Sequence, residues 1–146
     1  MLKPNFTGTW SFNRTQSVLQ IPAPDATTFI IEHREPNLHL SRTHVVGERH
    51  DSISLDLTTD GQEIQRELGD GLQFRGRAYW DGDALVFDTS LNRAGEEARN
   101  LVRYTLTNDG ATLRAEEHLR SSSLNYDNVW ILDRVEPSSR ASVPAL

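Results

Sequence analysis

The sequence predicts an all-β protein, a single antiparallel up-and-down meander β-barrel of about ten strands with little or no helix. Three observations support this fold class. Turn-forming residues recur at short intervals, the runs of six to ten residues between them alternate apolar and polar positions, and no segment has a persuasive helical period. Alternation with a period of two is typical of strands that bury one face.

The first half of the chain begins with a predicted strand at 7–13, which opens on the stretch NFTGTW. The next segment, 14–26, has room for at most a turn or two of helix, because Pro22 and Pro24 stop it. Alternating runs such as ISLDL then predict strands at 27–34, 38–46, 51–58 and 62–68.

The second half is predicted to contain strands at 72–80, 84–92, 98–107, 112–120 and 127–135. Asp-Gly pairs at 60–61, 81–82 and 109–110 supply the positive φ angles of tight hairpins, so consecutive strands are expected to be antiparallel neighbours. An open sheet of this size would leave two exposed edges, and closure into a barrel removes them.

The domain organisation follows from these strands. Residues 1–136 are expected to form a single barrel domain. The small, polar segment PSSRASVPAL at 137–146 is expected to be a disordered tail.

Composition excludes several classes of function. The net charge of −6, with 21 acidic and 15 basic residues spread along the chain, argues against nucleic acid as a partner. No apolar run approaches the ~18 residues of a transmembrane segment. Because the chain has no cysteine, disulfides, cysteine-bound zinc and thiol nucleophiles are excluded.

Metal and cofactor sites are not expected. The histidines form no close pair on a single strand, and several should face outward; they are His33, His39, His44, His50 and His118. The start MLKPNFTGTW has no apolar signal-peptide core, so the cytoplasm is the default compartment, with a secreted or periplasmic location if a signal peptide was removed. A monomer and a homodimer both remain open.

The start of the first strand carries a resemblance to a known superfamily. Phe6, Gly8 and Trp10 resemble the F-x-G-x-W signature of the calycins, which include the lipocalins and fatty-acid-binding proteins. The resemblance implies that Trp10 closes one end of the barrel and that a basic residue of the last strand, here Arg134 in NVWILDRVE, packs across its indole. Gly8 would let the chain enter the first strand closely.

Longer stretches also resemble bacterial lipocalin-like domains, with GTWSFNRTQS, IEHREPNL, WDGDALV and YTLTNDGATL in matching order. Two departures limit what the resemblance implies. Segment 14–26 is too short and too rich in proline for the helix pair of fatty-acid-binding proteins, and the last strand lacks their carboxylate-binding Arg-x-Tyr pair. A fatty-acid site is therefore not carried over.

The apolar phase of each strand identifies the residues that should face the interior. The candidate ligand-binding residues are Phe29, Ile31, His33, Leu40, Arg42, His44, Leu55, Leu57, Phe74, Trp80, Phe87, Tyr104, Glu117 and Trp130. Charged groups do not share a dry core without partners, so either the strand ends reach solvent or the barrel encloses a cavity of mixed lining.

Three functions are compatible with this pattern. The first is binding of a small hydrophobic or amphipathic molecule inside the barrel. The second is an enzyme, a lyase, isomerase, hydratase or cyclase, that uses His33, Arg42, Tyr104 and Glu117, with His33 and Glu117 as a base and its partner. The third is a structural or interaction module with a solid core.

Overall fold

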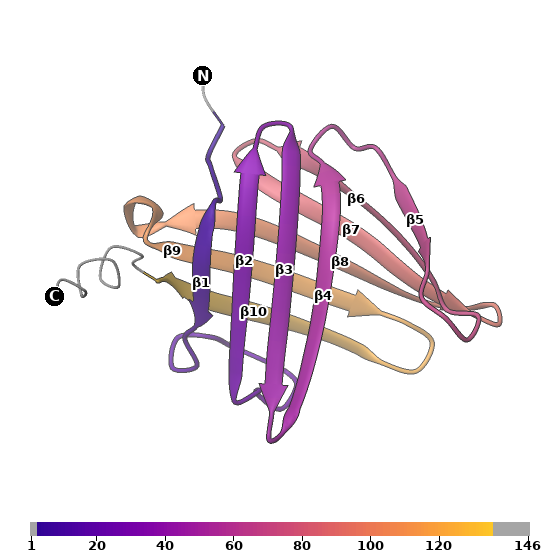
Figure 1. Cartoon of the computed structure of the whole chain (residues 1–146). Helices are drawn as coiled ribbons and strands as arrows, with labels where there is room; N and C mark the ends of the chain where they lie inside the picture. Colours follow the sequence, from indigo (N-terminus) through magenta and orange to yellow (C-terminus); the bar gives the residue numbers. More distant parts are fainter. Residues whose placement is uncertain (1–2, 136–146) are drawn as a thin grey trace, which may run out of the picture.

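The computed structural model describes residues 3–135 and consists of ten antiparallel strands (Figure 1). The strands are β1 (Gly8–Phe12), β2 (Ala26–Arg34), β3 (Asn37–Val46), β4 (Arg49–Thr58), β5 (Ile64–Glu67), β6 (Gln73–Asp81), β7 (Ala84–Arg93), β8 (Glu96–Thr107), β9 (Thr112–Arg120) and β10 (Asn125–Arg134). The predicted bounds of every strand lie within two residues of these. The tail predicted at 137–146 lies outside the described residues.

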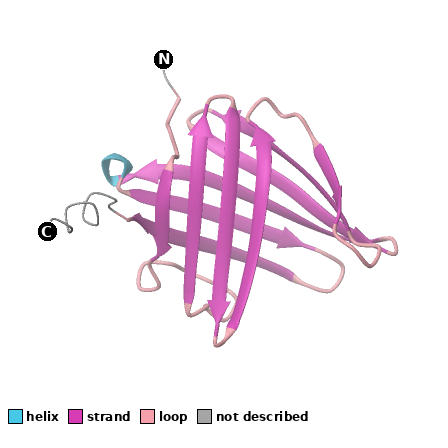
Figure 2. Ribbon diagram, viewed as in Figure 1, coloured by secondary structure: helices cyan, strands magenta, loops and turns pink. Residues whose placement is uncertain are grey.

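Helix is confined to one short 3₁₀ turn, η1 (Asn108–Gly110), within the described part of the chain (Figure 2). The all-β prediction is confirmed. No helix among residues 3–135 is long and apolar enough to cross a bilayer.

The alternation of apolar and polar residues with a period of two explains why these segments form strands with one buried face. In β2, for example, burial alternates strictly, with Thr27, Phe29, Ile31 and His33 buried and their neighbours more exposed. Such alternation lets one face of a strand pack on the core while the other meets solvent.

All strands belong to one sheet in the order β4-β3-β2-β1-β10-β9-β8-β7-β6-β5. The short strand β1 pairs with both β2 and β10, so that Trp10 lies opposite Phe29 on one side and Arg134 on the other. In Figure 1, β1 to β4 cross in front of the strands from β6 to β10. The sheet thereby curls into a nearly closed barrel.

One predicted hairpin is wrong. Asp60-Gly61 was expected to make a tight turn between paired strands, but β4 and β5 form the two ends of the sheet and do not pair. Instead, Asp60 bridges to Tyr79, and Gly61 N–H donates to the Ala78 carbonyl oxygen at 2.8 Å. The connection is held by β6, which leaves a gap between β4 and β5.

The other two Asp-Gly pairs do lie in hairpins, between β6 and β7 and between β8 and β9. At the first of these turns, Gly82 has φ +65°, a backbone conformation that favours glycine. The segment between β1 and β2 forms no helix. It runs along β10, where Val18 bridges to Val129.

The closed end of the barrel is built around Trp10, which is fully buried. The Arg134 guanidinium carbon lies 4.3 Å from the centre of the indole ring, and the indole N–H donates to the Phe6 carbonyl at 3.1 Å. Arg134 also donates to the carbonyls of Thr7 at 2.8 Å and Gly110 at 3.1 Å. One side chain therefore joins the N-terminal segment, the last strand and the η1 turn.

Gly8 is required at this junction for steric reasons. A Cβ at this position would lie 2.6 Å from Arg134 Nη1, and the residue has φ +154°. Any larger side chain would displace the guanidinium from the indole.

We expect Trp10→Ala to lower the free energy of unfolding by ~3 to 5 kcal/mol, because it removes a buried indole and leaves Arg134 without its aromatic partner. Urea denaturation measures the loss. Trp80→Ala serves as the control, since Trp80 is only half-buried and its truncation should cost less. Equal losses in the two variants would contradict the special role of Trp10.

Candidate functional site

The barrel interior is divided into a packed half and a hollow half. Beside the closed end, side chains fill the interior with almost no exposure; they are Phe6, Trp10, Ile31, Leu38, Leu57, Ala78, Leu85, Leu113 and Leu132. Farther along the strands lies a cavity of about 100 Å³. The cavity is smaller than the ~300 to 1,000 Å³ of typical small-molecule pockets, so it suits a small occupant.

Most of the predicted ligand-binding residues line this cavity. They are Phe29, Leu40, Arg42, His44, Leu55, Phe74, Phe87, Tyr104, Glu117 and Trp130. The remaining predicted residues, Ile31, His33, Leu57 and Trp80, are not among its lining residues. They lie instead toward the closed end.

On β3 and β9 the cavity lining changes from apolar to polar with distance from the closed end, whereas the apolar Phe74 on β6 lies beyond the level of Thr89. On β3, Leu40 comes before Arg42, and on β9, Ala115 comes before Glu117. We name two groups of lining residues accordingly. The apolar floor comprises Phe29, Leu40, Leu55, Phe74 and Phe87, and the polar rim comprises Arg42, His44, Thr89, Asn100 and Glu117.

Glu117 is the centre of the polar rim. One carboxylate oxygen accepts from Asn128 Nδ2 at 2.9 Å and from the Trp130 indole N–H at 2.8 Å. The other accepts from Asn100 Nδ2 at 2.9 Å. A carboxylate can be buried inside a barrel when donors such as these replace the hydrogen bonds that it would make to water.

Two buried polar atoms of the polar rim have no hydrogen-bond partner among the described residues, Arg42 Nε and Asn100 Oδ1. The orientation of the Asn100 amide is fixed, because its nitrogen donates to the Glu117 carboxylate and its oxygen could not. Both atoms belong to residues that line the cavity, although less than 1 Å² of either atom is exposed.

His44 is the residue of the polar rim that contacts β2. Its Nδ1 is hydrogen-bonded to Thr27 Oγ1 at 2.6 Å, and its ring stacks on Trp130 with centroids 5.4 Å apart. Burial and the nearby Arg42 lower the pKa of His44 from 6.5 to about 4. The ring is consequently uncharged at neutral pH.

Tyr104 is buried beside the same cavity and packs edge-on against Phe87, with ring centroids 4.8 Å apart. Burial, with a further contribution from Glu117, raises the pKa of its hydroxyl. The phenol therefore stays protonated.

The structure does not bring His33 together with Glu117, as the enzyme hypothesis required. Phe6 N–H donates to His33 Nδ1 at 3.2 Å, so the proton lies on Nε2, which donates to Glu35 at 2.8 Å. Glu35 also accepts from Thr59 at 2.7 Å and from the Trp80 indole at 3.0 Å. Burial alone would raise the pKa of Glu35, but these hydrogen bonds outweigh it and lower the pKa.

Sequence reasoning missed Asn100 and Asn128 as functional residues. Both were detectable, because Asn100 shares the inward phase of Val102 and Tyr104, and Asn128 shares that of Trp130. Asn128 is buried, and its Oδ1 accepts from Gln20 N–H at 2.7 Å. The amide thus connects the segment before β2 to Glu117.

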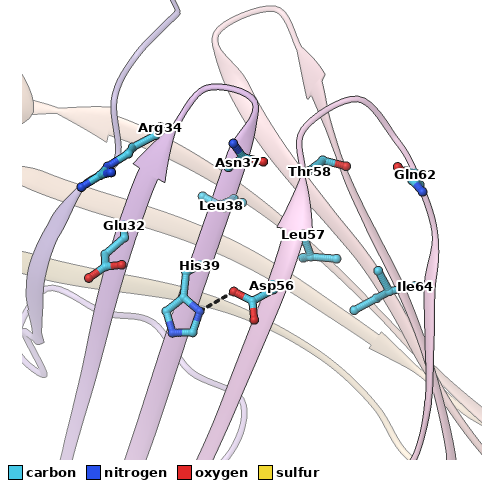
Figure 3. A pocket seen from close by; sticks show the side chains of 10 residues that line it. All are labelled: Glu32, Arg34, Asn37, Leu38, His39, Asp56, Leu57, Thr58, Gln62 and Ile64. Atoms are coloured by element: carbon cyan, nitrogen blue, oxygen red, sulfur yellow. Dashed lines mark hydrogen bonds and ion pairs between the residues drawn. The ribbon is translucent and has the colours of Figure 1, made fainter.

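A larger hollow of about 490 Å³ lies on the barrel wall near the gap between β4 and β5 (Figure 3). Its polar side chains on β2, β3 and β4 include Glu32, Arg34, His39 and Asp56, and the last two bond to each other at 2.6 Å. Because this groove is open and its His39–Asp56 pair is exposed, we place the candidate site in the interior cavity.

No protein-family profile matches the chain, and no curated protein sequence matches it. Solved structures do. Secretory abundant heat soluble protein 4 from Ramazzottius varieornatus is 18% identical, with a TM-score of 0.55 over 93% of this chain and 99% of that chain. Zebrafish ileal bile acid-binding protein, complexed with cholic acid, is 13% identical, with a TM-score of 0.61 over 89% and 98%.

The fluorescent protein UnaG is similar as well, with 16% identity and a TM-score of 0.55 over 89% of this chain and 97% of that chain. Together these structures show the fold of the chain, a β-barrel like those of the bile acid-binding protein and UnaG. The resemblance to bacterial lipocalin-like domains stays a prediction.

We expect Glu117→Leu to lower the free energy of unfolding by roughly 3 kcal/mol or more, because it leaves three N–H donors without their acceptor. Glu117→Gln should cost less than ~1 kcal/mol. Its oxygen can still accept from Asn128 and Trp130, and its nitrogen can donate to Asn100 once that amide turns over. Urea denaturation compares the two, and similar losses would contradict the hydrogen-bond assignment.

We expect the free energy of unfolding to fall as the pH is lowered from 6.5 toward 4. In this interval the unfolded chain binds a proton at His44 that the folded chain does not bind. The contribution of this half-buried ring should be about 1 to 2 kcal/mol after solvent screening. Urea midpoints at pH 7 and about pH 5 measure it. His44→Asn, which does not titrate, should lose less stability over this interval, and an equal loss would rule out His44 as the cause.

Proposed function

We propose that the protein binds a small amphipathic molecule in the interior cavity, with the apolar part of the ligand on the apolar floor. The observation that carries this proposal is the interior cavity itself, whose lining combines apolar side chains with the polar residues Arg42, His44 and Glu117. Apolar pockets with a few convergent polar groups are the usual form of small-molecule sites.

The fold supports the same proposal. The structurally similar bile acid-binding protein is complexed with cholic acid, so a barrel of this type can serve as a container. The cavity of about 100 Å³ favours a much smaller ligand here. An engineered cavity of roughly 150 Å³ is known to hold benzene, which sets the scale.

The contacts favour binding over catalysis by the polar rim. Both oxygens of Glu117 are occupied by donors, Tyr104 is held protonated by its raised pKa, and His33 lies in another cluster. None of the three residues His33, Tyr104 and Glu117 is thus poised to take a proton from a substrate in the way that the enzyme hypothesis required.

We expect Ala115→Leu to abolish ligand binding, because the added carbons occupy the cavity that Ala115 lines. The assay is an NMR titration with benzyl alcohol that follows the indole N–H of Trp130, which lines the cavity and bonds to Glu117. The same change on the exposed residue Ala26 is the control and should leave binding intact. Failure of benzyl alcohol and similar fragments to shift this resonance in the unmodified protein would overturn the proposal.

A further inference from the structure

The outer face of β3 and β4 carries a serine, a histidine and an aspartate in hydrogen-bonded order. Polar residues alternate with buried leucines along both strands, so His39, Ser41 and Asp56 point away from the barrel interior. His39 Nδ1 lies 2.6 Å from Asp56 Oδ1, and His39 Nε2 lies 3.4 Å from Ser41 Oγ. The hydroxyl of Ser54 lies 3.0 Å from Ser41 Oγ. We name these four residues the outer cluster; they form two successive cross-strand pairs, His39 with Asp56 and Ser41 with Ser54.

The bonding partners determine where the protons of the outer cluster lie. An ionised carboxylate can only accept, so His39 Nδ1 carries the proton that is donated to Asp56. In the uncharged imidazole, Nε2 is then the acceptor, and Ser41 donates its hydroxyl proton to it. Ser54 in turn donates to Ser41 Oγ. The Ser41 proton therefore points at the nitrogen that would remove it from a serine nucleophile.

A second histidine–aspartate pair lacks the serine. His118 Nδ1 also lies 2.6 Å from an oxygen of Asp127, and these two residues are likewise cross-strand partners, on β10 and β9. Arg120 shares the same Asp127 oxygen, and no hydroxyl among the described residues is hydrogen-bonded to His118 Nε2. The bond from a hydroxyl to the second ring nitrogen is thus what distinguishes the outer cluster from an ordinary surface contact.

The outer cluster borders a hollow that a small molecule can enter. His39 and Asp56 both line the groove of about 490 Å³ on the barrel wall, together with the apolar side chains of Leu57 and Ile64 (Figure 3). A short acyl chain therefore has an apolar surface beside the histidine.

We propose that the outer cluster hydrolyses esters of short carboxylic acids, with Ser41 as the nucleophile and His39 as the general base. A serine within reach of a base that a third group orients is the arrangement that activates a hydroxyl. The 3.4 Å contact is long, as such bonds often are before a substrate binds. This activity is independent of the interior cavity, so its failure leaves the proposed binding function untouched.

The reaction divides into two steps. Ser41 Oγ attacks the carbonyl carbon while its proton passes to His39 Nε2, and the alcohol leaves with that proton. Water, deprotonated by the same nitrogen, then attacks the acyl-serine and releases the carboxylic acid. Asp56 is a positioning residue that holds the proton on His39 Nδ1, and the Ser54 hydroxyl is the neighbouring donor for the negative charge that develops on the carbonyl oxygen.

Modification by diisopropyl fluorophosphate tests the nucleophile. Ser41 Oγ forms a bond to phosphorus as the bond to fluorine breaks, and fluoride leaves. The full chain is treated at about pH 8, above the ordinary titration range of histidine, and mass spectrometry locates the adduct. We expect Ser41 to react at least tenfold faster than Ser52, which lies on the same outer face but bonds to Thr43 at 2.9 Å.

Variants of the histidine–aspartate pairs test the base. His39→Gln should slow the modification of Ser41 at least tenfold, because the amide cannot take up the proton. His118→Gln is the matched control and should leave the rate unchanged. Asp56→Ala should also slow the reaction, and the ¹⁵N NMR shifts of the His39 ring should then show that the proton is no longer confined to Nδ1, a change that lost packing would not cause.

Hydrolysis itself is followed with 4-nitrophenyl acetate. Mass spectrometry should show an acetyl group on Ser41 that disappears once the ester is removed. The proposal is overturned if Ser41 reacts no faster than Ser52, or if His39→Gln and His118→Gln have equal effects. An acetyl group that persists on Ser41 would equally rule out the hydrolytic activity, because the second step would not occur.

Discussion

The stacking of Arg134 on Trp10 joins the last strand to the first, and the barrel depends on this junction. β1 has only five residues, yet it is the strand that pairs with both β2 and β10. Without it, the sheet would separate into the three strands β2 to β4 and the six strands β5 to β10. Gly8 makes the junction possible, because only a residue without a Cβ leaves room for the guanidinium.

A second constraint acts in the hollow half of the barrel, where Glu117 collects donors from β8 and β10. The hydrogen bonds that Glu117 accepts fix the orientation of the Asn100 amide and of the Trp130 indole. As a result, the Asn100 amide is held with its nitrogen toward Glu117 and its oxygen without a protein partner among the described residues. The hydrogen bonds to Glu117 thus determine how the neighbouring polar side chains of the cavity are oriented.

Much of the fold was predictable, because strand positions depend on local alternation, which reports the face a residue takes. The absence of pairing between β4 and β5 was not predictable. Asp60-Gly61 has the local sequence of a hairpin, but its backbone bonds to β6, since the curvature of the closing sheet decides which strand lies within reach. The site shows the same limit: phase placed His33 and Glu117 inside the barrel, but it could not place them at different heights along its axis.

The sequence by itself determined the number of strands, their inward faces and the pair of residues, Trp10 and Arg134, that meet at the closed end. These properties follow from period-two patterning and from a short motif, both of which are local. Only the tertiary structure decided which inward residues fill space and which surround a cavity. That outcome depends on how side chains from strands distant in the sequence meet across the barrel, since a void is a property of packed volumes rather than of any single strand.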